Sequence, residues 1–350
     1  MKNSYIIGTN TTAYVGIGFG AVRGEDLYVV ISNVTCKNLA ACISLHDGYV
    51  KGSILRVYNS SKGIFVASNG YAPYVNLTSV TIENTSTPVD IAGGSLKNVI
   101  IKNPTNGIKI NPYVRGVALA DITFVGISNY CLYIEPTTTN AKTITIENIT
   151  CSAVGQGLYI HPKNYTVSLS NITISGTPGL KIDASSLSEF ENINFDNVII
   201  NGKQAIYLKN NQSKVITNAG FVALINCTNI TLVNSALSNN YQNLILVNTT
   251  DSIIANNTIE NGYYGIQILG SCDNLIYNNK FVNNTQHVNY SAGTKNCNLW
   301  NTTLQNGINI VGGSYIGGNF WSNFSENCTD IKEPIGICDN PYTCLLYTSD

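Results

Sequence analysis

The chain has 350 residues, a formal net charge of −1 and only 11% charged residues, so it lacks the concentrated positive charge by which proteins bind nucleic acids or anionic membranes. Hydrophobic residues make up 44% of the chain, which is enough for a core, and asparagine is more frequent than all charged residues together. The composition therefore indicates a folded protein that does not bind nucleic acids or anionic membranes mainly through charge.

The first residues resemble the inside of a repeat rather than the start of a fold. Residues 3–8 read as part of an early coil, and no charged segment followed by an apolar one precedes them. We therefore expect that the sequence lacks an N-terminal cap, and the absence of a signal segment carries no information about location.

A short phrase then recurs along the chain. In each copy an asparagine is followed five residues later by an apolar residue that opens an alternating stretch, in the pairs Asn59 and Ile64, Asn84 and Val89, Asn103 and Ile108, Asn201 and Ile206, Asn261 and Ile266, and Asn283 and Val288. Variants of the phrase place Leu132, Leu158, Leu180, Leu244 and Ile308 at the apolar position. Recurrence at a period of mostly 19 to 26 residues indicates a solenoid.

The stretches that follow the phrase predict strands. They alternate apolar and polar residues, as in Ile108-Lys109-Ile110 and Leu132-Tyr133-Ile134, and they are rich in β-branched side chains. The consensus of leucine-rich repeats is absent. We therefore predict an all-β fold, a right-handed parallel β-helix of about a dozen coils over residues 1–325, followed by an irregular tail over 326–350. Nine residues are expected to line one interior column: Ile64, Val89, Ile108, Leu132, Leu158, Leu180, Ile206, Ile266 and Val288.

The recurrent asparagine is expected to occupy a sharp corner of each coil. Asparagine tolerates a left-handed backbone, and identical side chains on successive coils can hydrogen-bond along the axis. We expect Asn59, Asn84 and Asn103 to form one such ladder, and Asn261 and Asn283 a shorter one. The alternative is that asparagine is present only as a common turn residue.

Alignment of the repeats brings ionisable and aromatic side chains into one strip. The outward residue of successive strands is Lys109, Tyr133, Tyr159, Lys181 and then Tyr207, and the residue after each strand is Asn111, Glu135, His161, Asp183 and then Lys209. Such a strip is suited to an extended glycan, and Glu135, His161 and Asp183 are candidates for proton transfer. The alternative is that strand ends simply face water and carry polar residues.

Enzyme and metal signatures are scarce. The chain has none of the local motifs of pectate lyases, polygalacturonases or alginate epimerases, and glycoside hydrolysis needs two carboxylates that face a sugar. One methionine and three scattered histidines give no soft-ligand cluster, so we expect no metal and no cofactor.

Ten cysteines are many for a cytosolic chain and favour an extracellular location. Cys36 and Cys151 fall at equivalent positions inside strands, whereas Cys272 and Cys297 fall near the same turn on adjacent coils, where they are expected to approach within bonding reach. Asn-x-Ser/Thr sequons are frequent and permit surface glycosylation without showing it.

The C-terminal part resembles a known family. Trp300-Asn-Thr-Thr and the run from Gly307 to Trp321, GINIVGGSYIGGNFW, are similar to the closing coil of NosD-like right-handed parallel β-helix proteins, which are abundant on archaeal cell surfaces. The name-giving proteins are associated with copper-enzyme maturation, but the resemblance does not carry that role to this chain. Residues 344–350, CLLYTSD, resemble translated sequencing adapter and are expected to be non-native.

Two functional hypotheses follow. The first is a non-catalytic secreted or cell-surface β-helix, a structural or adhesion module that binds polysaccharide or other surface glycans along one face and does not bind nucleic acid. The alternative is a polysaccharide lyase or glycoside hydrolase of β-helix type. Whether Glu135, His161 and Asp183 converge in a groove distinguishes the two hypotheses. The sequence does not reveal a membrane anchor.

Overall fold

The computed structural model describes residues 2–7, 15–19, 28–67, 73–113, 115–137, 142–153, 155–291, 294 and 297–322. The chain is a β-solenoid of about 12 turns with one short helix, which confirms the predicted fold class. It divides into two compact units, Met1–Gly202 and Lys203–Asp350, and each is described by itself. The predicted tail, with Cys328, Cys338 and Cys344, lies outside the described residues.

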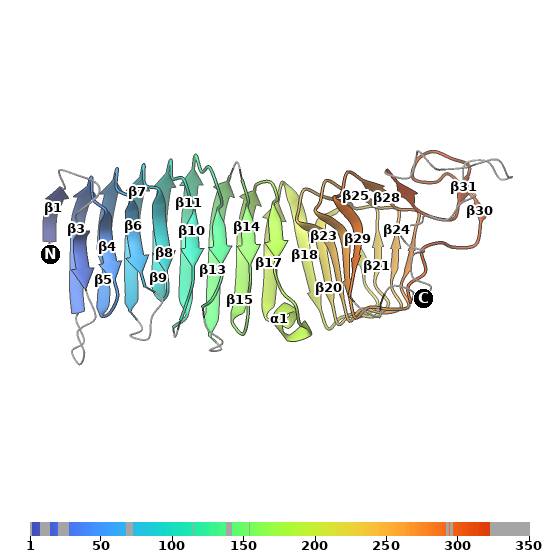
Figure 1. The fold of residues 1–350 in the computed structure, drawn as a ribbon, viewed down its shortest axis with the longest axis horizontal. Helices are drawn as coiled ribbons and strands as arrows, with labels where there is room; N and C mark the ends of the chain where they lie inside the picture. The colour runs from blue at the N-terminus through green and yellow to red at the C-terminus, as the bar shows by residue number, and fades with distance from the viewer. Residues whose placement is uncertain are drawn as a thin grey trace. The chain divides into compact units, whose positions relative to one another are not determined.

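The first unit alternates a long and a short strand along the chain (Figure 1). The long strands pair in parallel in chain order, and so do the short ones. The long strands are β1 (Lys2–Ile7), β3 (Tyr28–Lys37), β5 (Tyr49–Tyr58), β7 (Tyr74–Glu83), β9 (Gly94–Lys102), β11 (Val117–Val125), β13 (Thr143–Ser152), β15 (Thr166–Ser175) and β17 (Ile193–Ile200). The short strands are β2 (Val15–Phe19), β4 (Ala41–Leu45), β6 (Lys62–Val66), β8 (Thr87–Ile91), β10 (Ile108–Ile110), β12 (Leu132–Ile134), β14 (Leu158–Ile160) and β16 (Leu180–Ile182).

One helix, α1 (Leu187–Glu191), precedes β17. It starts where Ser186 accepts a hydrogen bond from the backbone N–H of Glu189, and the Glu189 carboxylate accepts one from the N–H of Ser185. The helix buries Phe190, so a single apolar side chain holds it on the unit.

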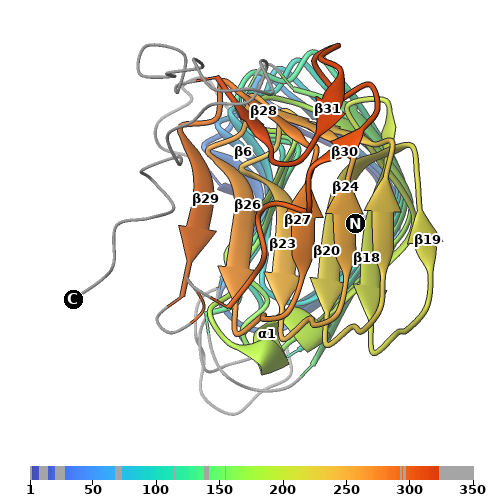
Figure 2. The same ribbon diagram turned by 90° about the vertical axis from the view of Figure 1, so that its right-hand side faces the viewer.

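Most turns of the second unit contain three short strands. Figure 2 shows the strands of its first sheet side by side. That sheet holds β18 (Lys203–Lys209), β20 (Ala219–Ile225), β23 (Gln242–Val247), β26 (Tyr264–Leu269) and β29 (Gln286–Tyr290). The second sheet holds β19 (Val215–Ile216), β21 (Thr231–Val233), β24 (Ile253–Ala255) and β27 (Leu275–Tyr277). The third holds β22 (Ala236–Ser238), β25 (Thr258–Glu260), β28 (Lys280–Val282) and β32 (Phe320–Trp321), and β30 (Gln305–Asn306) pairs antiparallel with β31 (Tyr315–Ile316).

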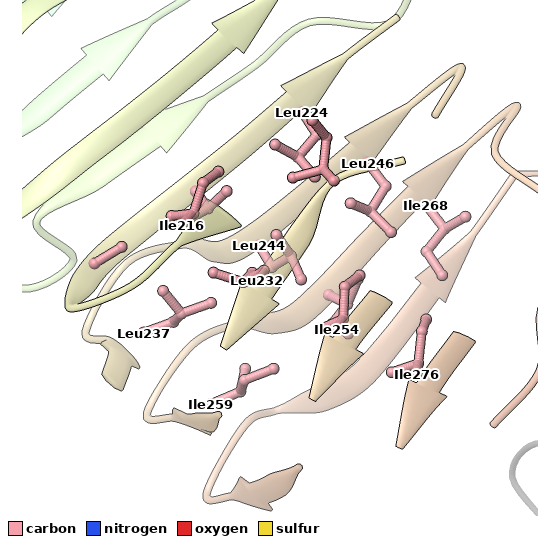
Figure 3. Close-up of a cluster of buried hydrophobic side chains, with 14 of the residues drawn as sticks. Ile216, Leu224, Leu232, Leu237, Leu244, Leu246, Ile254, Ile259, Ile268 and Ile276 are labelled. Atoms are coloured by element: carbon pink, nitrogen blue, oxygen red, sulfur yellow. The ribbon is translucent and has the colours of Figure 1, made fainter. Parts of the chain in front are cut away.

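The interior of each unit is a set of apolar columns, because alternate residues of every strand face inward. In the first unit the predicted column is confirmed over six turns, where each member pairs with the next and none is exposed: Ile64, Val89, Ile108, Leu132, Leu158 and Leu180. In the second unit leucine and isoleucine side chains from all three sheets meet between the strands, as Figure 3 shows.

The repeat alignment was wrong beyond Leu180. Ile206, Ile266 and Val288 do not continue that column, because they lie on β18, β26 and β29 and are joined in register through Val222 and Leu244. The recurrent phrase marks a corner of the chain. It does not determine which sheet the following strand joins, because that depends on the strand that lies beside it in space. Ile308, also aligned to the column, is 80% exposed between β30 and β31.

The asparagine ladder is confirmed, but it lies on the outside. The Asn84 amide donates to Asn59 Oδ1 at 3.1 Å, the Asn103 amide donates to Asn84 Oδ1 at 3.3 Å, and all three residues have φ near +50°. All three side chains are exposed. Asn261 and Asn283 occupy the corresponding corners of two successive turns in the second unit, where the Asn261 N–H donates to the carbonyl of Val282.

A second kind of ladder was not predicted. It is buried and belongs to the residue that follows the corner asparagine: the Asn257 amide donates to Asn279 Oδ1 at 3.0 Å, and the Asn279 amide donates to Asn319 Oδ1 at 3.1 Å. These amides also satisfy backbone carbonyls inside the corner, such as Leu232 O and Ile254 O. The sequence signal is the doubled asparagine, Asn256-Asn257 and Asn278-Asn279, in which the second residue is fully buried. The first residue is exposed at Asn256 but covered at Asn278, where its Oδ1 accepts a hydrogen bond from the Ile310 N–H.

We expect Asn103→Ala to lower the free energy of unfolding by about 1 kcal/mol, because an exposed hydrogen bond contributes little and the main cost is an alanine held at positive φ. Chemical denaturation measures the change. The control, Asn103→Gly, should stay close to wild type because glycine accepts that backbone angle. An equal loss in the glycine variant would show that the side-chain ladder, not the backbone, determines stability at this corner.

Candidate functional site

The sequence-predicted strip exists over four turns of the first unit. The register of β10, β12, β14 and β16 places Lys109 beside Tyr133, Tyr133 beside Tyr159, and Tyr159 beside Lys181. Their neighbours in each strand are fully buried isoleucines and leucines, so the four side chains point to the outer face of the sheet.

Close contacts link these side chains. The rings of Tyr133 and Tyr159 are stacked with centroids 4.3 Å apart, and Lys181 Nζ lies 5.3 Å from the centroid of Tyr159. The Tyr159 hydroxyl donates to Asp183 Oδ2 at 2.7 Å. The strip is therefore an ordered array of tyrosine, lysine and carboxylate groups on successive turns.

The same column continues toward the N-terminus through two residues that the sequence analysis missed. Asp90 on β8 pairs with Lys109, and Phe65 on β6 pairs with Asp90. Lys62 Nζ lies 4.1 Å from the Phe65 ring centroid. The signal was present, since Phe65 and Asp90 each follow the apolar residue of a repeated phrase, as Lys109 does. We call Asp90, Lys109, Tyr133, Tyr159 and Lys181 the outer strip.

Two acceptor atoms of this face are buried and have no hydrogen-bond partner, Asp90 Oδ1 and Asn111 Oδ1. Burial raises the pKa of the Asp90 carboxyl, while the nearby charges of Lys109 and Lys62 and a hydrogen bond from Asn111 oppose the rise. Buried acceptors without donors are costly, so this end of the strip is suited to a ligand that brings hydroxyl or amide hydrogens.

The tyrosines are neutral donors at physiological pH. Burial raises the pKa of Tyr130, which packs against Tyr133, to about 12. Burial also raises the pKa of Tyr133 and that of Tyr159, the latter helped by its hydrogen bond to Asp183. A phenol with a raised pKa keeps its proton, so these groups can hydrogen-bond a ligand and do not serve as bases near neutral pH.

The aromatic part of the strip is less open than the sequence suggested. Tyr159 is only 6% exposed, and the stacked rings cover each other's faces. A sugar therefore cannot lie flat between these two rings, and the ring edges and polar ends are what a ligand meets. Changing both tyrosines to alanine is therefore expected to lower the stability as well as any binding, because Tyr159 belongs to the packed interior of the strip.

The residues predicted to follow the short strands form a row, which we call the rim. Glu135, His161 and Asp183 come directly after β12, β14 and β16, and their backbone N–H groups donate to Ile110, Ile134 and Ile160. They therefore lie in a row, one on each turn, with Asn111 on the turn before Glu135. Glu135 and His161 are half-buried and Asp183 is exposed. Proton transfer by this row stays a prediction.

Tyr207 and Lys209 are not part of the sheet that β10, β12, β14 and β16 form. Both lie on β18 in the second unit, where Tyr207 pairs with Ala223 and Lys209 with Ile225 of β20. Tyr207 is half-buried, and this burial raises the pKa of its hydroxyl. The alignment failed here for the same reason that it failed at Ile206.

The described residues contain no group of three or more histidine, cysteine, aspartate or glutamate side chains that could hold a metal ion. His46 packs against Phe65, His161 follows β14, and His287 lies in β29. The free thiol of Cys227 is buried and donates to the carbonyls of Leu208 and Ile225. The donor set of the described part of the chain does not match a soft metal ion.

Three disulfides indicate an extracytoplasmic protein. The predicted approach of Cys272 and Cys297 is confirmed as a disulfide with Cα atoms 4.9 Å apart. Cys36 pairs with Cys42, and Cys151 pairs with Cys131, which the sequence did not predict. No helix within the described ranges is long and apolar enough to span a membrane.

Comparison with known protein families identifies the family of this chain. The model of the family described as periplasmic copper-binding protein (NosD) matches residues 95–326. No curated protein and no solved structure matches the chain. The matched segment includes the strip from Lys109 to Lys181 and the closing turns of the second unit.

Proposed function

The chain belongs to the NosD family of β-helix proteins, and from this premise we propose that it is a non-catalytic cell-surface or secreted module that binds an extended glycan along the outer strip. Family members are generally non-catalytic accessory proteins. The observation that carries the proposal is the array itself, in which parallel stacking repeats polar side chains at every turn, about 4.8 Å apart.

The chemistry of the strip supports a polyhydroxylated ligand. Two buried acceptors, Asp90 Oδ1 in the strip and Asn111 Oδ1 beside it, have no hydrogen-bond donor, and sugar hydroxyls are donors that a polymer supplies repeatedly. Lys109 and Lys181 offer N–H donors to sugar oxygens. Positive and negative side chains are interspersed, so the ligand class is a neutral polysaccharide rather than a polyanion.

The copper of the family description is not part of this proposal. The described residues provide no cluster of histidine, cysteine and carboxylate side chains, and the only methionine, Met1, lies outside them. The donor groups therefore do not fit a copper ion, and we assign no step to one.

A glycan array with the purified chain, followed by calorimetry on the best neutral polysaccharide, tests the proposal. We expect the double variant Lys109→Ala/Tyr133→Phe to bind at least about tenfold more weakly, since it removes two hydrogen-bonding groups of the strip. Lys102→Ala is the matched control, because Lys102 is an exposed lysine of β9 outside the strip, and its affinity should not change.

Two results would contradict the proposal. Absence of glycan binding by the wild type would leave a purely structural module. Release of reducing ends from a polysaccharide, lost in Glu135→Gln or Asp183→Asn, would show instead that the rim is catalytic and that the alternative hypothesis, a polysaccharide lyase or hydrolase, is correct.

A further inference from the structure

A second array of tyrosines lies at the start of three long strands of the first unit, whereas the outer strip lies on the short strands. Tyr28, Tyr49 and Tyr74 pair in register at the start of β3, β5 and β7. Their rings are stacked with centroids 5.0 and 5.1 Å apart and planes within 10° of each other. We call these three residues the tyrosine strip.

A cation accompanies each end of the tyrosine strip. Lys51 Nζ lies 5.3 Å from the centroid of Tyr28, and a hydrogen bond to Tyr28 raises the pKa of Lys51. The guanidinium carbon of Arg115 lies 5.4 Å from the centroid of Tyr74. Both cationic side chains are exposed, as is half of Tyr28. Among the described acidic residues, Asp47 is the nearest to Lys51 in sequence, and its carboxylate accepts a hydrogen bond from the Gly48 N–H at 2.6 Å.

Arg115 reaches Tyr74 because the position between them, on the intervening turn, is a glycine. Gly93 stands immediately before β9, in the turn that separates Tyr74 from Arg115. A Cβ atom at Gly93 would come within 3.1 Å of Arg115 Cβ and 3.0 Å of the Pro73 carbonyl oxygen. The glycine therefore leaves room for Arg115 to extend along the sheet over the tyrosine ring.

From this arrangement we propose that the tyrosine strip, with Lys51 and Arg115, is a second binding surface, and that its ligand is an acidic polysaccharide. The two cations stand at least two rungs apart, about 10 Å, which exceeds the Debye length of about 8 Å at physiological salt. They therefore act as two separate contacts, which fits a polymer with repeated carboxylates better than a single anion. The three hydroxyls between them face the sugar hydroxyls.

The same geometry argues against a nucleic acid. Single-stranded nucleic acids bind by stacking bases on open aromatic faces. Tyr49 has a tyrosine ring on each face, and Tyr74 is covered by Tyr49 and by Arg115. Tyr28 is stacked on one face by Tyr49 and has Lys51 Nζ 5.3 Å from its centroid, so the strip offers no row of open ring faces. What it repeats for a ligand are ring edges and hydroxyls, and these suit carboxylates and hydroxyls.

Calorimetry with polygalacturonate as the acidic probe and dextran as the neutral one tests the proposal. We expect the wild type to bind polygalacturonate with an affinity that falls as salt rises, and the double variant Lys51→Gln/Arg115→Gln to bind at least about tenfold more weakly. Gly93→Ala should also weaken binding, although it changes no charge, because it displaces Arg115. Far-UV circular dichroism verifies that each variant is folded.

Lys102→Gln removes one positive charge outside the strip and should leave the affinity unchanged. The proposal is overturned if the wild type does not bind polygalacturonate, or if Lys102→Gln weakens binding as much as Arg115→Gln does, which would show diffuse charge attraction. Should Gly93→Ala not fold, Arg115→Lys takes its place, since it keeps the charge but loses the planar group and should still weaken binding. The outer strip uses other residues and a neutral ligand, so either surface can fail without the other.

Discussion

Replacing Asn257 with alanine is expected to lower the free energy of unfolding of the second unit by about 4 kcal/mol, because it leaves several buried backbone groups without partners. The Asn257 amide donates to the carbonyls of Leu232 and Ala255, both at 2.9 Å, and its Oδ1 accepts from the Ser235 N–H at 2.9 Å. The side chain is fully buried, so water cannot take its place. Urea denaturation followed by circular dichroism measures the loss.

The neighbouring asparagine provides the matched control. Asn256 is exposed and holds the left-handed corner with φ +56°, so Asn256→Ala should cost only about 1 kcal/mol. The loss of unfolding free energy should then differ severalfold between two adjacent asparagines, because Asn256 faces outward and Asn257 faces inward. Equal losses in the two variants would contradict the distinction between an outer and an inner ladder.

The double variant Cys272→Ala/Cys297→Ala is expected to lose about 3 kcal/mol of unfolding free energy, because the disulfide closes a loop whose ends are 25 residues apart in sequence and so restricts the unfolded chain. The same loss should follow reduction of the wild type, and mass spectrometry of unreduced material should find the two cysteines linked. Thermal unfolding in the presence and absence of a reductant measures the effect.

Cys227→Ala controls for the loss of buried sulfur alone. Cys227 is a free, buried cysteine of the same unit, so its replacement should cost only the packing of one small side chain and should not depend on the redox state. Free thiols at Cys272 and Cys297 in unreduced secreted protein would refute the pairing and weaken the case for an extracytoplasmic location.

The sequence by itself determined the local features of this protein. Alternation with period two identified the strands, and the left-handed preference of asparagine identified the corners. The fixed distance from corner to strand also gave the correct register from Lys109 to Lys181, because in a parallel stack the register of one turn is inherited by the next. These signals depend only on residues near one another in the chain, so a single sequence carries them.

The outer strip shows the limit of such signals. Outward direction follows from alternation, but exposure does not: Tyr159 points outward and is nevertheless 6% exposed, because the turns on both sides place side chains against it. For the same reason the orphaned acceptors of Asp90 and Asn111 could not be predicted. Burial on an outer face depends on which side chains the neighbouring turns place against a residue, and this follows only from the stacked structure.

Only the tertiary structure decided which segments pair. The phrase before Ile206 matches the earlier phrases, yet its strand joins β20, since pairing depends on the strand that is adjacent in space. The partners of Cys36 and Cys151 and the division of asparagines into an exposed and a buried ladder were decided in the same way. Backbone preference and alternation are properties of a few consecutive residues, whereas pairing, burial and disulfide formation depend on residues that meet only when the turns stack.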